Sequence, residues 1–541
     1  MKDGFRQSMA WLHTWCGITV GWVLYFIFVT GTAGYFSTEI DRWMRPELPL
    51  SSAPMQPSAA VALALARIQA EAQDAEHWTI TLPNRGPEPE LRVAWRTKPG
   101  AAGTPGTTRT VYPGRSPGNE EARSPVERQT GGGTLLYQMH YRLHYIDMNT
   151  AAWLVGFCTM CMLVSILSGV ITHKKIFRDF FTFRPRKGQR SWLDAHNVLA
   201  VLGLPFITMI TYSGLVLLMA IYVPFIMNAA YGPDLENHAP FYDAVNPRLA
   251  DGGPSGVPAQ LTAIEPLIAD AERDGNVGRL LAIRARYVGD ANARIIITHQ
   301  HDAPLRGNRQ QVFDGVSGVP LARGTPERTG PWRVHDLLIG LHEGRYAGPG
   351  MRWLYFLLGL MGTAMVATGL VLWTVKRQER SRGTDKAKSL MLIERLNVGT
   401  LLGLPIGIAA YFHANRLLPV AFEGRGTWEA HVLFITWALT LGLAWLRPVR
   451  RAWYELSCCT AAAYALLPLT NWLASNRHLG VTLAHDHWRG EWSLAGFDLT
   501  MMMLGLLFAA LAFSLRSKIP HSPALAQTPP GPPDPVAEGL D

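Results

Sequence analysis

The chain has 541 residues, of which 48% are hydrophobic and only 17% are charged. Its net charge of +9 comes from basic residues clustered beside long apolar runs, which is typical of membrane proteins and not of nucleic-acid-binding proteins. The five cysteines lie in or beside those runs, which excludes a disulfide framework in the polar segments.

Eight apolar runs are long enough to cross a lipid bilayer, and they predict an all-α membrane bundle of about eight transmembrane helices. The runs lie at residues 9–36, 149–172, 194–223, 351–375, 394–418, 429–447, 452–473 and 493–515. The first run is too long for the core of a cleaved secretion signal, so we expect it to remain as an anchor.

Basic residues in the short links between the runs set the expected orientation. The links after the second, fourth and sixth runs are rich in lysine and arginine, most of all at residues 174–190. Because short basic loops stay in the cytoplasm, both termini are expected there, and segments 37–148 and 224–350 are expected on the opposite side. The pattern favours a multi-pass protein of the bacterial inner membrane.

The two long polar segments have the composition of small α+β domains. The expected helices are 58–72 and 259–273, and the expected strands are 78–82, 91–97, 108–112, 280–287, 293–299 and 309–313. The stretch 99–133, rich in Gly, Pro, Ser and Arg, predicts a mobile loop. His299 and His301, at the end of a strand, are expected on the surface.

The chain therefore divides into membrane and polar parts. The expected parts are transmembrane helix 1 (1–36), the first polar domain (37–148), helices 2 and 3 with their basic link (149–223), the second polar domain (224–350), helix 4 (351–375), a four-helix extension (394–515) and a disordered cytoplasmic tail (519–541).

The first four runs contain an internal duplication. His13 precedes Gly31 by 18 residues, and His196 precedes Gly214 by the same 18 residues. The unit is a helix, a polar domain and a returning helix, used twice in one orientation. Parallel repeats in a membrane are related by an axis along the membrane normal, so matching residues face each other across it. His13 is therefore expected to meet His196 near the inner face.

The returning helices match as well. They carry Ser168-Gly169 and Thr368-Gly369, and His144 and His342 lie 25 and 27 residues before these glycines. This alignment pairs His144 with His342 near the outer face. The small residues of all four Thr/Ser-Gly pairs are expected to allow close approach between helices.

Paired histidines in a membrane suggest haem. Ionisable residues there are costly and indicate function, and neutral imidazole is an axial ligand of haem iron. We expect two haems of b type, because no CxxCH motif for covalent attachment occurs. The candidate axial ligands are His13, His173 and His196 at the inner face and His140, His144 and His342 at the outer face, with His335 as a substitute for His342.

Other interpretations of these histidines stay open. A histidine at a helix end is commonly an interfacial or capping residue, and His173 stands where its repeat partner is Trp373. His144 and His173 are 29 residues apart, about 43 Å in a continuous helix, which is far for electron exchange.

The last four runs offer fewer signals. His413 and His431 lie near outer helix ends, and a loop carries His478, His485, Asp486 and His487, which predicts either a metal site or an ordinary polar loop. No P-loop and no Rossmann fingerprint occurs, so an electron donor must come from outside the chain.

Several segments together resemble the PepSY-associated transmembrane family. They are LHTWCGITVGW, LYQMHYRLHYIDM, SGVITHKKIFRDFFTFRP, SWLDAHNVLAVLGLPF and IGLHEGRYAGPGMRWLYFLLGL. QVFDGVSGVPLA resembles a strand-turn segment of a PepSY domain, whereas TVYPGRSPGN in the first polar segment departs from it. The resemblance spans residues 5–380, and the last four runs look like an extension found in some members.

Proteins similar to this one include inner-membrane ferric-siderophore reductases with two b-type haems. The resemblance implies PepSY-like periplasmic domains, bis-histidine haem sites at the six candidate positions, and reduction of a ferric siderophore by a cytoplasmic or membrane electron donor. The expected protein is thus an oxidoreductase that releases iron(II), with no catalytic residue assigned. The alternatives are a PepSY-type regulatory or ligand-binding membrane protein and a siderophore or metal transporter.

Overall fold

The computed structural model describes most of the chain. The described residues are 3–48, 50, 55–83, 91–98, 106–113, 128–173, 184–185, 187–222, 224–232, 253–273, 277–301, 308–323, 330–344, 346–381, 386–489 and 492–516. The expected tail at 519–541 and most of the basic link at 174–190 lie outside these residues.

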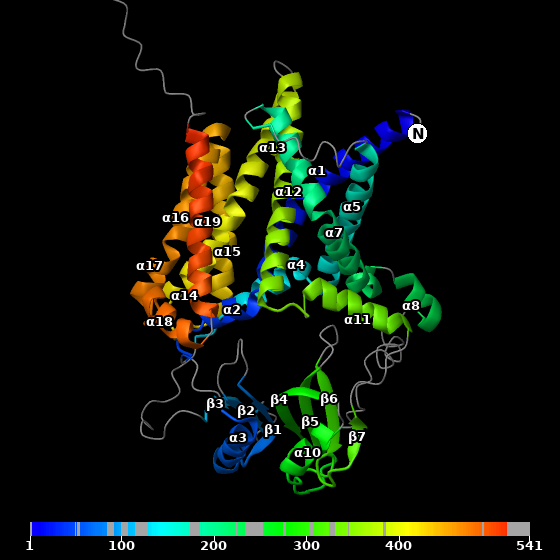
Figure 1. The fold of residues 1–541 in the computed structure, drawn as a ribbon, viewed down its shortest axis with the longest axis vertical. Coiled ribbons are helices and arrows are strands. Elements are labelled where there is room, and N and C mark those ends of the chain that lie inside the picture. The colour runs from blue at the N-terminus through cyan, green and yellow to red at the C-terminus, as the bar shows by residue number, and fades with distance from the viewer. Residues whose placement is uncertain are drawn as a thin grey trace, which may run out of the picture.

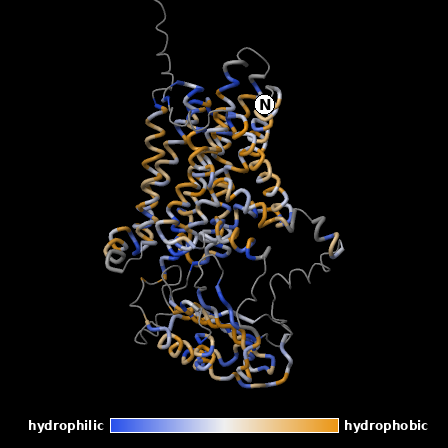
Figure 2. The backbone as a smooth tube through the Cα atoms, turned by 45° about the vertical axis from the view of Figure 1, so that its right-hand side comes forward, coloured by the Kyte–Doolittle hydropathy of each residue, from blue (hydrophilic) through white to orange (hydrophobic). Residues whose placement is uncertain are grey.

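Among the described residues, eight stretches of helix are long and apolar enough to span a membrane, which confirms the expected helical bundle (Figures 1 and 2). They are α1 (Asp3–Gly34), α5 (Met148–Thr172), α7 (Gln189–Tyr222), α12 (Pro349–Ser381), α13 with α14 (Lys386–Leu401 and Gly403–Leu417), α15 (Arg425–Leu446), α16 with α17 (Val449–Ala465 and Leu467–Ala474) and α19 (Ser493–Arg516). We call the helices from α13 to α19 the C-terminal bundle.

The fifth span is broken between α13 and α14 because of a proline. Pro405 has no N–H to donate to the carbonyl of Leu401, four residues earlier. The hydroxyl of Tyr25 in α1 donates to that carbonyl instead, at 2.8 Å. A side chain from a neighbouring helix therefore satisfies a backbone group that the apolar surroundings could not.

Five shorter helices lie at one end of the bundle (Figure 1). They are α2 (Ser37–Trp43), α4 (Gly132–Arg142), α8 (Pro224–Tyr231), α11 (Gly330–Glu343) and α18 (Leu479–Arg489). The first residues of α1 and the end of α19 lie at the opposite end. Helix α18 forms where the sequence predicted a polar loop.

The two polar segments form one sheet beyond the ends of the helices. Its strands are β1 (Ala75–Thr81), β2 (Arg92–Thr97), β3 (Thr108–Val111), β4 (Val277–Arg286), β5 (Arg294–His301), β6 (Arg309–Asp314) and β7 (Pro320–Arg323), in the order β3-β2-β1-β4-β5-β6-β7. Each segment therefore supplies strands as expected, and the two units join edge to edge.

The join lies between β1 and β4, which pair antiparallel in a register that places Ile80 opposite Ile283. Both residues are fully buried, in a core closed by α3 (Pro57–Glu71) and α10 (Glu265–Arg273). Because β1 and β4 are the first strands of their segments, the strand order is nearly symmetric about this join. The two halves of the sheet are thus related by the same duplication as the two halves of the membrane-spanning part.

The strand expected at 108–112 is confirmed, because residues 108–111 form β3. The mobile loop expected at 99–133 is wrong at its described end, where residues 128–133 pack against the membrane helices and Arg128 is buried. The expectation that His299 lies on the surface is also wrong. Its side chain points into the sheet core with Ile295 and Ile297, because residues two apart on a strand share one face.

Candidate functional site

The rings of His13 on α1 and His196 on α7 lie together near the end of the bundle farthest from the sheet. Their centroids are 6.2 Å apart and their planes meet at 71°. His13 Nδ1 is 2.8 Å from the carbonyl oxygen of Ser165 on α5, and His196 Nδ1 is 2.9 Å from that of Met365 on α12. Because a carbonyl only accepts, each Nδ1 carries the proton and each Nε2 keeps a lone pair.

A second pair lies near the sheet end. His140 on α4 and His342 on α11 have ring centroids 6.3 Å apart and planes only 22° from parallel. His140 Nδ1 donates to the carbonyl of Tyr137, and His342 Nδ1 is 2.8 Å from the hydroxyl oxygen of Ser213. That hydroxyl gives its own hydrogen to the Met209 carbonyl at 2.7 Å, so it accepts from the imidazole.

The outer pair is held neutral. Both histidines lie outside the eight membrane-spanning stretches. Burial lowers the pKa of His140, and burial together with the nearby His140 lowers the pKa of His342 to about 3. Among the described residues, no hydrogen bond occupies Nε2 of any of the four rings. The two outer rings, neutral and with Nδ1 protonated, therefore each present an available lone pair at Nε2.

Each of the four rings lies against the glycine of a Thr/Ser-Gly pair. The contacts are His13 on Gly169, His196 on Gly369, His140 on Gly31 and His342 on Gly214. An added Cβ would lie 3.1 Å from a ring atom at Gly169 and at Gly369, and 3.3 Å at Gly214. Gly169, Gly369 and Gly214 thus make room for imidazole rings, whereas an added Cβ at Gly31 would be in ordinary contact with His140, at 3.6 Å.

Close approach between helices uses other glycines. An added Cβ on Gly359 of α12 would lie 2.4 Å from Thr32 of α1, and one on Gly362 would lie 2.5 Å from Phe28. The sequence showed the Thr/Ser-Gly pairs and their spacing from histidine.

The predicted partner of His342 is corrected. His144 does not contact it, and its ring instead stacks on Phe434 of α15, with centroids 5.4 Å apart. Helix α4 ends at Arg142, and Leu143, His144 and Tyr145 all have positive φ, between 52° and 55°. This left-handed turn directs His144 to the C-terminal bundle and leaves His140 facing His342.

The remaining candidates lie beside the pairs. His173 ends α5, where its N–H bonds the Gly169 carbonyl, and it is close enough to His13 and His196 to interact electrostatically. His335 lies two turns before His342 on α11, with its ring 3.9 Å from the Asp336 carboxylate.

The histidines of the C-terminal bundle have other partners. His413 uses both ring nitrogens, on the Ala463 carbonyl at 2.9 Å and the Thr470 hydroxyl at 3.0 Å. His431 bonds the Tyr145 hydroxyl, and the side chains of His485, Asp486 and His487 lie outside the described residues. In the part of the chain that is described, no three His, Cys, Asp or Glu residues gather as a site for a bare metal ion.

The two pairs are closer together than the sequence suggested. Along α1, His13 and Gly31 are 18 residues apart, which corresponds to about 27 Å of helix. Helix α4 is separate from α5 and folds back against α1, so His140 lies within the bundle. The separation of about 43 Å expected for one continuous helix therefore does not apply.

A cavity of about 480 Å³ opens at the outer pair. His140 and His342 line it, together with Gly31, Gly214 and apolar side chains such as Leu24 and Phe206. Leu24 and Phe206 lie about midway along α1 and α7, so the cavity extends towards the inner pair. Its size and mainly apolar lining with a few polar groups are typical of cofactor and ligand sites.

The comparison with known families covers the part of the chain that contains this site. The family profile described as PepSY-associated TM region matches residues 10–376, more than half of the chain. The chain belongs to the PepSY-associated transmembrane family. None of the curated proteins compared with it gives a match. The part matched to the PepSY-associated family contains both histidine pairs, all four ring-contacting glycines and the whole sheet, and it ends before the C-terminal bundle.

Proposed function

We propose that this protein is a haem-b-containing reductase of the bacterial inner membrane, which passes electrons to a ferric siderophore in the periplasm. The observation that supports the proposal is the presence of two facing histidine pairs at two depths of one helical bundle. Each pair presents available Nε2 atoms and has both Nδ1 atoms engaged in hydrogen bonds.

The ring spacing fits axial ligation of one iron. An imidazole nitrogen coordinates a first-row metal at about 2 Å, and the ring centroid lies about 1.2 Å behind that nitrogen. Two imidazoles on opposite sides of one iron therefore have centroids about 6.4 Å apart. The pairs have 6.2 and 6.3 Å. His13 with His196, and His140 with His342, would hold the two haems.

Bound haem iron would supply a one-electron carrier at each site. The residues of the chain prepare those sites. Hydrogen bonds from Nδ1 to Ser165 and Met365 orient the inner rings and raise their basicity as ligands. The lining of the outer cavity is mainly apolar, and burial in such surroundings is one of the factors that set a redox potential.

The expected orientation gives electron transfer a direction. The helix ends that lead into the basic links, and both ends of the described chain, lie at the inner-pair end, and short basic links are retained in the cytoplasm. The sheet and the outer pair then face the periplasm, where a ferric siderophore is the proposed acceptor. Hard oxygen donors hold iron(II) less tightly than iron(III), so a one-electron reduction releases the metal. The electron donor would act from the cytoplasm or the membrane.

Visible spectra of the purified protein, oxidised and then reduced with dithionite, test the proposal. We expect a Soret band and a content of two haems per chain. His196→Ala and His342→Ala should each remove one haem, whereas His144→Ala and His335→Ala should keep both. A folded, colourless protein made with ample iron and haem would refute the proposal and favour a ligand-binding role for the PepSY-associated protein.

Reduction of the substrate is tested separately. In proteoliposomes with reductant inside, a ferric siderophore outside should yield ferrous iron, trapped by a ferrous-specific chelator. Both His196→Ala and His342→Ala should abolish this signal. Retention of the signal in either variant would contradict a path through both sites.

A further inference from the structure

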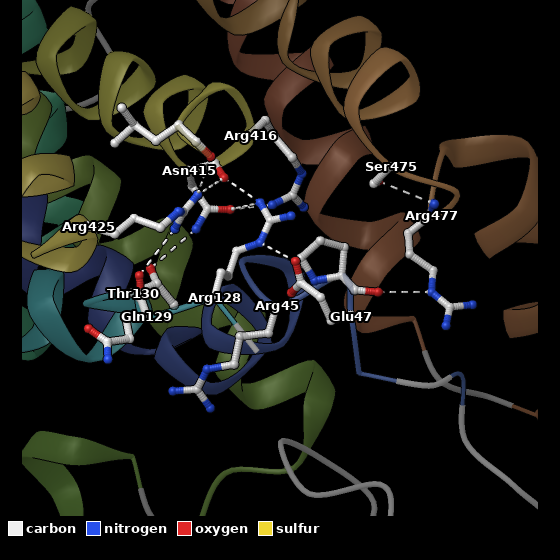
Figure 3. Close-up of polar contacts among 12 residues, drawn as sticks. Arg45, Glu47, Arg128, Gln129, Thr130, Asn415, Arg416, Arg425, Ser475 and Arg477 are labelled. Carbon is white, nitrogen blue, oxygen red and sulfur yellow. Dashed lines mark hydrogen bonds and ion pairs between the residues drawn. The ribbon is translucent and has the colours of Figure 1, made fainter. Parts of the chain in front are cut away.

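A buried polar cluster connects the start of α4 to the C-terminal bundle. We call it the α4 anchor and define it as Arg128, Thr130, Asn415, Arg425 and Glu429. Figure 3 shows Arg128 and Arg425 directed towards Asn415 from two different elements. The side chains of Arg425, Glu429 and Asn415 are completely inaccessible to solvent.

Glu429 is the centre of the anchor. Its carboxylate accepts hydrogen bonds from the Thr130 hydroxyl, from the Asn415 amide at 2.8 Å and from the Arg425 guanidinium. The same Thr130 hydroxyl accepts from the backbone N–H of Gly132, the first residue of α4, at 3.1 Å. The chain entering α4 is thereby tied to α14 and α15.

Arg128 adds a second tie. Its guanidinium bonds the backbone carbonyl of Asn415 and forms an ion pair with Glu47 at 2.6 Å. Glu47 belongs to the segment that leaves α2 for the sheet. The anchor therefore holds both connections between the membrane helices and the first three strands.

Three successive glycines let the chain pass between α2 and α14. Gly132 has a φ of +59°, and an added Cβ there would lie 1.7 Å from Asp41 of α2. An added Cβ on Gly133 would lie 2.1 Å from the carbonyl of Ser37. On the other side, the Tyr411 hydroxyl of α14 donates to the Gly132 carbonyl at 2.8 Å. The start of α4 is thus fixed on two sides.

The position of this start decides where His140 lies. His140 is eight residues after Gly132, about 12 Å along the helix. Helix α4 has only 11 residues, and a helix of that length is not stable by itself. Its far end enters the left-handed turn at Leu143. A shift at the anchor is therefore transmitted along α4 to the ring of His140.

The buried charges indicate that the α4 anchor positions the start of α4 and does not merely stabilise the packing of helices. Desolvating an arginine and a glutamate is costly, and well-packed apolar residues stabilise a bundle as well or better. What an ion pair with several fixed hydrogen bonds adds is one defined geometry. Here that geometry includes Thr130, which lies outside the C-terminal bundle.

We propose that the C-terminal bundle holds α4 in register through the α4 anchor, so that His140 faces His342. Thr130, Glu429, Arg425 and Asn415 are positioning residues for the outer haem site. The inference rests on the proposed function for its haem readout, and it gives the helices beyond the family match a role in the same site.

The matched variants Thr130→Val and Thr130→Ser test the proposal. Valine has nearly the shape of threonine and lacks the hydroxyl, whereas serine keeps it. We expect Thr130→Val to lower the haem content from two to one per chain, or to shift the midpoint potential and the low-spin EPR signal of the outer haem alone. The ring-plane angles of 71° and 22° give the two sites distinguishable EPR signals. Thr130→Ser should behave as the parent protein.

Glu429→Gln and Tyr411→Phe extend the test with different chemistry, and both should affect only the outer site. Glu455→Gln is the control in the bundle, because Glu455 pairs with Arg447 and Arg451. It should leave both haems unchanged. Equal effects of Thr130→Val and Glu455→Gln, or unchanged outer-haem signals in Thr130→Val and Glu429→Gln, would overturn the inference while the proposed function stands.

Amide hydrogen exchange supplies a readout that needs no haem. In Thr130→Val, residues 134–142 of α4 should exchange faster than in Thr130→Ser, while α16 exchanges at the parent rate. If the parent protein holds no haem, the proposed function fails and this measurement still decides the anchor. Unchanged exchange of α4 in Thr130→Val would show that the anchor does not hold it.

Discussion

The contact between Gly169 and His13 makes a quantitative prediction. In Gly169→Ala, the new Cβ would lie 3.1 Å from Cε1 of His13, so the ring must move by a few tenths of an ångström. Overpacking of this kind costs about 1–3 kcal/mol. A cost of 1.4 kcal/mol is a factor of ten, so haem affinity at the inner site should fall about 5- to 150-fold.

Two glycines of α1, Gly31 and Gly17, supply matched controls for Gly169 of α5. At Gly31 an added Cβ would be 3.6 Å from His140, an ordinary contact, and at Gly17 it would meet nothing within 4 Å. Alanine favours a helix interior over glycine by about 0.5–1 kcal/mol, so a loss in Gly169→Ala cannot come from the helix itself. Haem titration into each purified apoprotein gives the affinities. The reasoning would be refuted if Gly169→Ala and Gly31→Ala had the same haem affinity at the inner site, or if Gly169→Ala bound haem there as tightly as the parent protein.

Two further predictions concern stability. Tyr25→Phe should leave the Leu401 carbonyl unpaired beside Pro405 and cost about 1–3 kcal/mol, seen as a lower Tm in detergent with haem content unchanged; an unchanged Tm would contradict this. His299 is buried without a partner for either ring nitrogen, and burial lowers its pKa. Because the unfolded chain protonates below about pH 6.5 while the folded one stays neutral, stability of the sheet should be complete above that pH and decline below it, by at most about 1.4 kcal/mol per pH unit. Hydrogen exchange of β5 between pH 7.5 and 5.5 should show this decline, and His299→Phe should remove it; an equal pH response in the variant would contradict the assignment.

The helical bundle and its duplication were predictable because both leave marks in the linear sequence. Apolar runs of membrane length give the spans, and the equal spacing from His13 to Gly31 and from His196 to Gly214 gives the repeat. The meeting of His13 and His196 follows from that symmetry. The spans, the repeat and the inner histidine pair can therefore be predicted from the lengths of the apolar runs and the spacing between residues.

The sequence indicated both His140 and His144 as outer candidates but paired the wrong one with His342, because a local conformation decides the pairing. His140 and His144 lie on the same face of any continuous helix, so periodicity cannot choose between them. The choice is made by the positive φ angles of Leu143 to Tyr145, which residues of these types rarely adopt and which no turn signal announces. The glycines at 131–133 likewise looked like a loop, because their packing partners Ser37 and Tyr411 are distant in sequence.

The single sheet was hidden for a related reason. β1 and β4 are about 200 residues apart, and nothing in either strand marks the other as its partner. The burial of His299 has the same origin, because the face of β5 that points inward is set by the helix packed against it. Pairing between distant segments is a property of the assembled chain.

The ladder between β1 and β4 also limits how the membrane halves can move. Five residue pairs fasten the strand that follows α1 and α2 to the strand that follows α7 and α8. In carriers built from two repeats, transport requires one half to rock against the other. A sheet built from strands of both halves joins them outside the membrane, and such a join favours a fixed arrangement of the halves over rocking. A fixed arrangement of the halves fits the proposed electron transfer better than it fits the transporter alternative.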